Sequence, residues 1–247
     1  MANMSVVILL IVFVVSTLAS PLLFNHLDKH QYTDCQKIND AGYKKTGQYL
    51  LWYAKTNDTK LHPFTVECQM KGDAAYTVIQ RRMYGNENFY RTFFDYVNGF
   101  GHPQGDYWAG LNLIYHLTST GNNVLNVQMQ DWSGNNKNAR YSYFRLMDNV
   151  HFVLNIGGFY STDVADDLSF NNGYAFATYD KPDVSGCASN QKGGWWYNYC
   201  TYALPNGVYY PGGPYTPSTG YYDGIYWKDW LGYGYSLKFI SLTLSNQ

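Results

Sequence analysis

Residues 124–132 read VLNVQMQDW, and apolar side chains occupy every second position from Leu125 to Met129. A period of two is typical of a β-strand with one buried face and one solvated face. A similar alternation recurs over residues 139–146 and 150–159. Three such runs in succession predict neighbouring strands of one antiparallel sheet, since antiparallel sheets commonly keep one face on the core and the other in water.

Further elements are predicted on both sides of these strands along the sequence. Residues 235–244, YSLKFISLTL, form another period-two run, which we expect to enter the main sheet. Residues 76–82 predict a strand, and residues 48–69 predict two strands around a polar turn. Residues 89–97 carry aromatic side chains at helical spacing, and the Asn98-Gly99 that follows is typical of a helix C-terminus.

Tyrosine takes the place of charge in the composition. The 247 residues include 17 Lys+Arg and 18 Asp+Glu, 14% of the total, where an ordinary domain has about 25%. There are 26 Tyr, aromatic residues make up 19%, and mean hydropathy is -0.36. Only Glu67 and Glu87 are glutamates, which favours strands and loops over helices. A net charge of -1 argues against nucleic-acid binding and against a disordered acidic tail.

The aromatic residues gather between residues 195 and 235. This segment holds eleven Tyr, four Trp, seven Gly and four Pro, too many breakers for regular structure and too many rings for disorder. We expect loops folded around their own rings, a place where binding sites are often found. Because paired tryptophans beside a disulfide usually bury it, we expect Trp195, Trp196 and Trp230 to belong to the core.

The N-terminus has the layout of a signal peptide at residues 1–19. Residues 6–15, VVILLIVFVV, are an unbroken apolar run of ten followed by small and polar residues. A bilayer span needs about 20 apolar residues. We therefore expect a secreted, extracellular protein cleaved near Ala19, with a short tail at 20–33, one domain at 34–247 and no later membrane span. An uncleaved leader that acts as an anchor is the alternative.

The cysteines agree with an extracellular protein. Four cysteines, Cys35, Cys68, Cys187 and Cys200, are an even number, which suggests two disulfides in a secreted protein. Their clustering favours the pairs Cys35–Cys68 and Cys187–Cys200 among the three possible pairings. A zinc site is the rival, but no C-x-x-C spacing is present. The triplet that begins at Asn57 predicts a surface glycan.

A series of short motifs runs in order through residues 34–244. They are YTVIQRR at 76–82, GFG at 99–101, GDYWAG at 105–110, LT at 117–118, DW at 131–132, FATYD at 176–180, CA at 187–188, GWWY at 194–197, NGVY at 206–209 and YSLK at 235–238. This series resembles the fibrinogen C-terminal domain family, which includes fibrinogen, ficolins, tachylectin-type lectins, tenascins and angiopoietins. The 13-residue interval from Cys187 to Cys200 also fits the family.

The resemblance implies an α+β fold with three parts. A small N-terminal subdomain precedes a central antiparallel sheet, and a loop-rich C-terminal subdomain binds ligand. In the family, a loop just before the third cysteine binds calcium through aspartates and backbone carbonyls. The matching loop here is shorter, and the resemblance implies Asp180 and Asp183, with a carbonyl near Ser185, as calcium ligands. A metal-free turn with Pro182 at its second position is the alternative.

The resemblance also implies a ligand pocket beside the second disulfide. By position, its residues are Gln191, Tyr199, Cys200, Thr201, Tyr221, Tyr222 and Trp227, and the family's cis peptide falls at Tyr199–Cys200. Thr201 stands where lectin members have histidine, and Tyr222 stands where the γ chain of fibrinogen has aspartate. The implied pocket is therefore neutral and walled by tyrosine, which suits an acetyl group or a sugar ring and does not suit a cationic peptide terminus.

Two classes of function follow from this pocket. The first is a secreted lectin-like recognition protein, of innate immunity, that binds glycans or acetylated groups on microbial or self surfaces. The alternative is a secreted receptor ligand or extracellular-matrix protein that binds a cell-surface or matrix protein through the same domain. No G-x-S-x-G or H-E-x-x-H motif is present, so we expect no enzyme. With no spare cysteine, any homo-oligomer is expected to form by non-covalent contacts.

Overall fold

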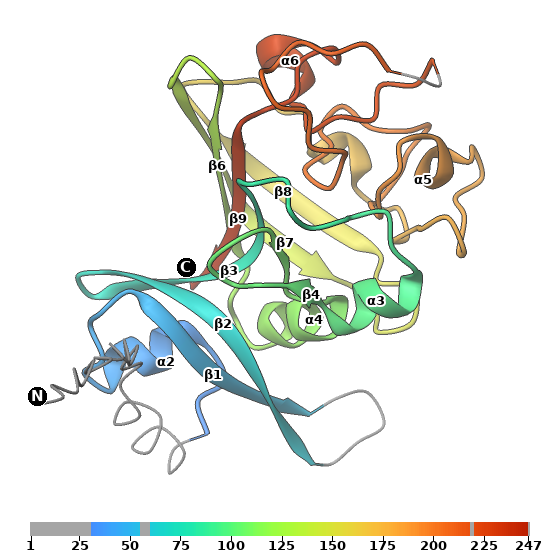
Figure 1. The fold of residues 1–247 in the computed structure, drawn as a ribbon. Helices are drawn as coiled ribbons and strands as arrows, with labels where there is room; N and C mark the ends of the chain where they lie inside the picture. The colour runs from blue at the N-terminus through green and yellow to red at the C-terminus, as the bar shows by residue number, and fades with distance from the viewer. Residues whose placement is uncertain (1–30, 55–59, 218–219, 247) are drawn as a thin grey trace, which may run out of the picture. The chain divides into compact units, whose positions relative to one another are not determined.

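The computed structural model describes residues 31–54, 60–217 and 220–246. Its compact unit is Tyr32–Gln247. The strands in the described residues are β1 (Gly47–Ala54), β2 (Leu61–Lys71), β3 (Ala74–Arg82), β4 (Phe100–Gly101), β5 (Tyr107–Trp108), β6 (Val124–Gln130), β7 (Asn136–Leu146), β8 (Leu154–Tyr160) and β9 (Phe239–Ser245). They form one nine-stranded antiparallel sheet in the order β1-β2-β3-β9-β6-β7-β8, with β5 paired to β3 and β4 (Figure 1).

The strand β9 occupies the centre of this sheet. Leu244 lies opposite Thr77 of β3 on one side and opposite Leu125 of β6 on the other. The alternating apolar residues of β6 are buried, with Leu125 fully enclosed and Val127 and Met129 each 1% exposed. The prediction that the last run enters the main sheet is confirmed, and so is the antiparallel order of β6, β7 and β8.

The helices of the described residues are short. They are α2 (Cys35–Asp40), α3 (Phe93–Asn98), α4 (Leu111–Ser119), α5 (Cys187–Asn190), α6 (Lys228–Leu231) and the 3-10 turn η1 (Ser169–Asn171). The helix predicted from residue 89 begins instead at Phe93, because Thr92 and Asp95 form a capping box: each side chain accepts the other's backbone N–H at 3.2 Å. It ends where predicted, before Gly99, whose φ of 89° favours glycine.

Two predicted strands begin later than expected, because their first residues form hydrogen bonds outside the sheet. The carboxylate of Asp148 accepts the backbone N–H groups of residues 150–153, which form a turn, so β8 begins at Leu154. These hydrogen bonds also lower the pKa of Asp148, although desolvation acts in the opposite direction. Residues 235–238 belong to the C-terminal loops, where the N–H of Leu237 donates to the carbonyl of Ile225 at 2.7 Å.

A cluster of buried aromatic side chains attaches the C-terminal loops to the sheet. Trp108 of β5 lies 5.5 Å from Tyr96 of α3, 5.7 Å from Phe176 and 6.3 Å from Trp196, measured between ring centroids. All four rings are buried. Trp195 and Trp196 thus belong to the core as predicted, whereas Trp230 is only partly buried. The cluster fixes the loops around the second disulfide onto a rigid base.

Both predicted disulfides are present. Cys35 is bonded to Cys68, and Cys187 is bonded to Cys200, so all four cysteines are used. The predicted signal peptide at 1–19 and the sequon at Asn57 lie outside the described residues. Within the described ranges, no helix is long and apolar enough to cross a membrane.

Candidate binding site beside the second disulfide

The backbone turns sharply just before Cys200. The Tyr199–Cys200 peptide is trans, contrary to the cis bond implied by the family resemblance. Two consecutive left-handed residues make the turn instead, with φ of 44° at Tyr199 and 72° at Cys200. The N–H of Asn198 closes the turn by donating to the Cys200 carbonyl at 2.8 Å. As a result, the Tyr199 side chain is 84% exposed.

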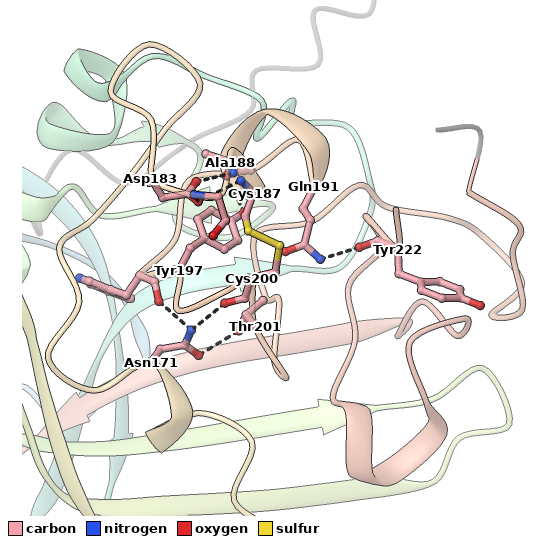
Figure 2. The surroundings of a disulfide bond; sticks show 12 residues. Asn171, Asp183, Cys187, Ala188, Gln191, Tyr197, Cys200, Thr201 and Tyr222 are labelled. Atoms are coloured by element: carbon pink, nitrogen blue, oxygen red, sulfur yellow. Dashed lines mark hydrogen bonds between the residues drawn. A yellow bond between two sulfur atoms is a disulfide. The ribbon is translucent and has the colours of Figure 1, made fainter. Parts of the chain in front are cut away.

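Gln191 does not face an open pocket. It is 5% exposed, and its amide donates to the carbonyl of Tyr222 at 2.8 Å (Figure 2). The amide also donates to the hydroxyl of Tyr226 at 2.8 Å. Its role is to tie the loop around residue 222 to α5. Its side-chain oxygen is buried and has no partner in the described structure.

Thr201 is also occupied within the protein. Its hydroxyl is buried, 2.9 Å from the side-chain oxygen of Asn171 and 2.7 Å from the carbonyl oxygen of Ala203. The amide nitrogen of Asn171 donates to the carbonyls of Trp196 and Cys200 (Figure 2). Thr201, which stands where lectin members have histidine, therefore helps Asn171 of η1 hold the loop that follows the disulfide.

The remaining aromatic residues of the predicted pocket point to different places. Trp227 is 1% exposed, and its indole N–H donates to the carbonyl of Ala165 at 2.9 Å, so it belongs to the core. Tyr221 and Tyr222 are 49% and 43% exposed. The Tyr222 side chain extends away from the disulfide (Figure 2). The predicted residues lie in one subdomain, but they do not enclose a common cavity.

Many tyrosines of this subdomain pack against each other. Tyr210 stacks on Tyr215 at 4.3 Å, Tyr215 meets Tyr222 edge-on at 6.2 Å, and Tyr222 lies 5.8 Å from Tyr233. Aromatic pairs of this kind contribute about 0.5–1.5 kcal/mol beyond the area they bury. Burial raises the pKa of Tyr215 and Tyr226, so these hydroxyls stay neutral. The tyrosine excess in this segment thus builds a core for the loops.

An open cleft lies beside the same disulfide. It has a volume of about 330 Å³ and is lined by residues 174–177, residues 181–185, Tyr197 and Tyr199. We call it the aromatic cleft. Its buried side is formed by Phe176 and Tyr197, which are 1% and 3% exposed, while Tyr174, Val184 and Tyr199 are exposed. The sequence motif at 176–180 passes through the cleft, but the motif alone gave no sign of a cavity there.

The charged groups of the aromatic cleft are bound within the protein. The Asp183 carboxylate accepts the backbone N–H groups of Ser185 and Cys187 at 3.0 Å and of Ala188 at 2.9 Å, at the start of α5. The Lys181 ammonium donates to the carbonyl of Val150 at 3.0 Å. It also lies over the Phe93 ring, 3.7 Å from the centroid. The surface that the cleft offers to a ligand is therefore largely apolar and uncharged.

The carboxylates implied for calcium accept hydrogen bonds within the protein. The Asp180 carboxylate accepts from the N–H of Phe93 at 2.8 Å and from the hydroxyl of Thr178 at 2.7 Å, so it caps the start of α3. Both oxygens of Asp183 are occupied by backbone N–H groups. Calcium takes six to eight oxygen ligands. In the described ranges, no group of three or more His, Cys, Asp or Glu side chains could hold a metal. Calcium binding stays a prediction.

A buried carboxyl group lies near Trp227. Asp167 is 0% exposed, and one of its oxygens accepts the backbone N–H of Asp229 at 2.8 Å at the start of α6, while the other has no partner in the described structure. Burial and the negative charge of Asp229 together raise the pKa of Asp167 to about 7. Sequence reasoning missed this group, because nothing in the sequence around an isolated aspartate indicates its burial.

The fold and the disulfide-bounded loops define the class of protein. The family model described as the fibrinogen beta and gamma chains, C-terminal globular domain, matches residues 31–247. The chain belongs to this family.

Known members of the family are similar over most of the chain. Human angiopoietin-related protein 6 is 38% identical over 212 residues, covering 84% of this chain and 43% of that protein. Human fibrinogen-like protein 1 is 36% identical over 234 residues, covering 87% of this chain and 72% of that protein. The chain thus spans less than half the length of the angiopoietin-related protein that it matches.

Solved structures agree with the fold. The fibrinogen-like globe domain of human ANGPTL6 superposes with a TM-score of 0.78 at 36% identity, covering 87% of this chain and 96% of that one. The lamprey fibrin D-dimer, solved in complex with the peptide Gly-His-Arg-Pro-amide, gives a TM-score of 0.78 at 29% identity, covering 87% of this chain and 73% of that one.

Proposed function

We propose that the protein is a secreted, non-enzymatic ligand that binds a protein partner through the aromatic cleft. The observation that carries this proposal is the cleft itself, about 330 Å³ in volume, with Phe176 and Tyr197 buried and Tyr174, Val184 and Tyr199 exposed around them. Exposed rings around a concave apolar surface are typical of protein interfaces, in which tyrosine is enriched. The N-terminal apolar run and the two disulfides support secretion.

The chemistry of the cleft defines the part of the partner that would enter it. Lys181 and Asp183 are already engaged, so a charged side chain would find no counter-ion among them. An aromatic or branched apolar side chain would be favoured by about 1.5–3 kcal/mol when fully buried. Micromolar binding requires about 8 kcal/mol, so the partner must also contact the exposed rim.

The relatives favour a protein ligand over a carbohydrate. They include angiopoietin-related and fibrinogen-like proteins, and the lamprey fibrin domain binds a peptide. Gln191, Thr201 and Trp227, which the carbohydrate interpretation required, are buried, and each donates a hydrogen bond within the protein. No observation in the described structure supports an acetyl-group pocket.

A binding screen with point variants tests the proposal. The full secreted protein is presented multivalently to an array of cell-surface and matrix ectodomains and, in parallel, to a glycan array. For a partner found on the protein array, Tyr199→Ser and Val184→Arg should each weaken binding at least tenfold, because both remove apolar surface at the rim of the cleft.

Two further variants identify the surface that is used. Tyr84→Ser removes a tyrosine that is 62% exposed outside the cleft and should leave binding unchanged. Tyr221→Ser removes an exposed tyrosine of the pocket implied by the lectin members and should also have no effect. Binding to the glycan array that is lost in Tyr221→Ser and kept in Tyr199→Ser would contradict the proposal and restore the carbohydrate interpretation.

A further inference from the structure

A second cavity lies at the end of β3, and it shares no lining residue with the aromatic cleft. It has a volume of about 350 Å³ and is lined by Arg82, residues 85–90, Lys192 and residues 207–209. Arg82 is the last residue of β3, and residues 85–90 connect that strand toward α3 (Figure 1). The cavity is large enough for a small polar group and the few atoms attached to it.

The guanidinium of Arg82 is buried with most of its hydrogen-bonding capacity unused. Arg82 is 2% exposed, and its guanidinium carbon Cζ lies over the Phe89 ring, 3.9 Å from the centroid. Its Nη1 donates to the carbonyl of Gly207. Nε is buried and has no partner in the described structure. A guanidinium has five N–H donors, and a buried donor without a partner costs about 1–3 kcal/mol.

The acidic groups near Arg82 are occupied elsewhere. The Asp106 carboxylate accepts the backbone N–H groups of Met83, Tyr84 and Asn86 and so holds the turn that follows β3. Glu87 is paired with Arg91. Among the described residues, no carboxylate forms an ion pair with Arg82. Burial lowers its pKa to about 10, although the negative charges of Asp106 and Glu87 act in the opposite direction, so Arg82 stays charged at neutral pH.

The second cation of the cavity is balanced. The Lys192 ammonium lies 2.9 Å from the carboxylate of Asp223, which is fully buried. Of the cations that line the cavity, Arg82 is therefore the one that lacks a direct counter-ion. The planar set of N–H donors on a guanidinium matches the two oxygens of a carboxylate.

We propose that this cavity, which we call the Arg82 cavity, binds a carboxylate of a protein partner, supplied by an acidic side chain or by the partner's C-terminal residue. The cation–π contact with Phe89 and the hydrogen bond to Gly207 fix the guanidinium in place, and the unused N–H groups remain for the ligand. The asparagine amide of Asn86 lies at the exposed part of the lining, where it can donate to the same carboxylate.

Nuclear magnetic resonance tests the proposal on the full-length protein. Acetate is the probe, and the signal followed is the Nε–H resonance of Arg82, assigned through its own backbone. We expect this resonance to shift and saturate with millimolar acetate, while the same ionic strength of sodium chloride leaves it in place. An equal response to chloride, or none to either salt, would overturn the proposal.

A matched pair of variants isolates the role of charge. Asn86→Glu places a carboxylate at the mouth of the cavity, and Asn86→Gln has the same size without the charge. Because the Asn86 side chain is exposed, both variants should fold. Acetate should bind at least tenfold more weakly to Asn86→Glu than to Asn86→Gln, and equal affinities would contradict the proposal.

Two model peptides separate the sources of the carboxylate. N-acetyl-aspartate amide offers an acidic side chain, and N-acetyl-glycine offers a terminal carboxylate. Saturable binding of either peptide supports the proposal and names the source, whereas N-acetyl-glycine amide, which has no carboxylate, should not shift the Arg82 resonance. Binding by all three compounds alike would show that the carboxylate is not what the cavity recognises.

Discussion

Single polar side chains set the conformation of the loops around the second disulfide. Asp183 accepts three backbone N–H groups, Asn171 connects two carbonyls, and Gln191 joins two tyrosines. Each side chain replaces hydrogen bonds that an irregular backbone cannot make within itself. Substituting one of these side chains should therefore lower the free energy of unfolding more than substituting an ordinary surface residue.

Ionisation of Asp167 should lower stability as pH rises. Its pKa of about 7 in the folded protein exceeds the ordinary value of 3.8. The folded state therefore holds the proton more tightly, and the free energy of unfolding falls as pH rises from about 4 to about 7. Asp167→Asn keeps an oxygen for the N–H of Asp229 and cannot ionise. It should raise the urea midpoint at pH 8 relative to wild type and leave it nearly unchanged at pH 4.

A surface carboxylate provides the control for this effect. Asp73 has a fully exposed side chain, and Asp73→Asn should shift the urea midpoint little at either pH. If Asp167→Asn also leaves the midpoint at pH 8 unchanged, the buried carboxyl does not carry the pH dependence.

Asp183 should stabilise the protein by capping α5. Asp183→Ala leaves three backbone N–H groups without their acceptor, and a lost cap costs about 0.5–2 kcal/mol. We expect the melting temperature of Asp183→Ala, measured by differential scanning calorimetry, to be lower than that of the wild type. The decrease should be the same in calcium and in chelator. A melting temperature of the wild type that rises with calcium, and does not rise in Asp183→Ala, would show instead that this carboxylate binds the ion.

At the scale of elements, the sheet depends on the strand at its centre. Leu242 of β9 lies opposite Val127 of β6 and is 1% exposed. Leu242→Ala should lower the free energy of unfolding by about 2–5 kcal/mol, because it leaves a cavity in the core against the buried face of the sheet. Leu61→Ala, at a position that is 40% exposed, is the control and should cost much less. Similar losses in both variants, measured by urea denaturation, would contradict a central role for β9.

The strands were predictable from the sequence where apolar and polar side chains alternate along them. Each predicted strand exists, since a period-two run has few other ways to bury its apolar face. The helix α4 was missed, although Leu111, Ile114 and Leu117 recur at helical spacing, because its nine residues are fewer than the window of about 11–18 residues over which helical periodicity is read. Helix α2 was not predicted either, because it has only six residues and begins at a cap formed by Asp34.

The binding surface was less predictable than the sheet. The sequence located the tyrosine-rich loops and both disulfides, but it did not show which side chains face outward. Tyr199 is exposed at a left-handed turn, while Trp227 is buried and donates to the carbonyl of Ala165, 62 residues away in the sequence. Tyr174 and Tyr199 both line the aromatic cleft, although they are far apart in the sequence. Such juxtapositions depend on packing between segments and have no local signal.

At the scale of the whole molecule, the two disulfides should make unequal contributions to binding. The Cys187–Cys200 bond spans 13 residues and should stabilise the fold by about 3 kcal/mol, while the Cys35–Cys68 bond spans 33 residues and should contribute about 4 kcal/mol. Replacing both Cys187 and Cys200 by Ser should nonetheless weaken partner binding more than replacing both Cys35 and Cys68 by Ser. The reason is that the Cys187–Cys200 bond supports the loops of the aromatic cleft.

Two measurements separate these effects. Urea denaturation gives the loss of stability of each disulfide variant, and binding to the partner is measured well below the midpoint of both. Limited proteolysis should cut the Cys187→Ser/Cys200→Ser variant first between residues 181 and 201. Equal losses of binding in the two variants would mean that the second disulfide acts only through global stability. A non-covalent homo-oligomer stays a prediction, to be checked by sedimentation.

The central place of β9 also affects how the protein folds during synthesis. In the described sheet, β1–β2–β3 and β6–β7–β8 are joined through β9, which follows all of them in the sequence. Both groups of strands leave the ribosome before the strand that joins them, and each then presents an unpaired edge. Such edges are prone to wrong pairing. The nascent polypeptide should therefore need chaperones to shield β3 and β6 until β9 has emerged.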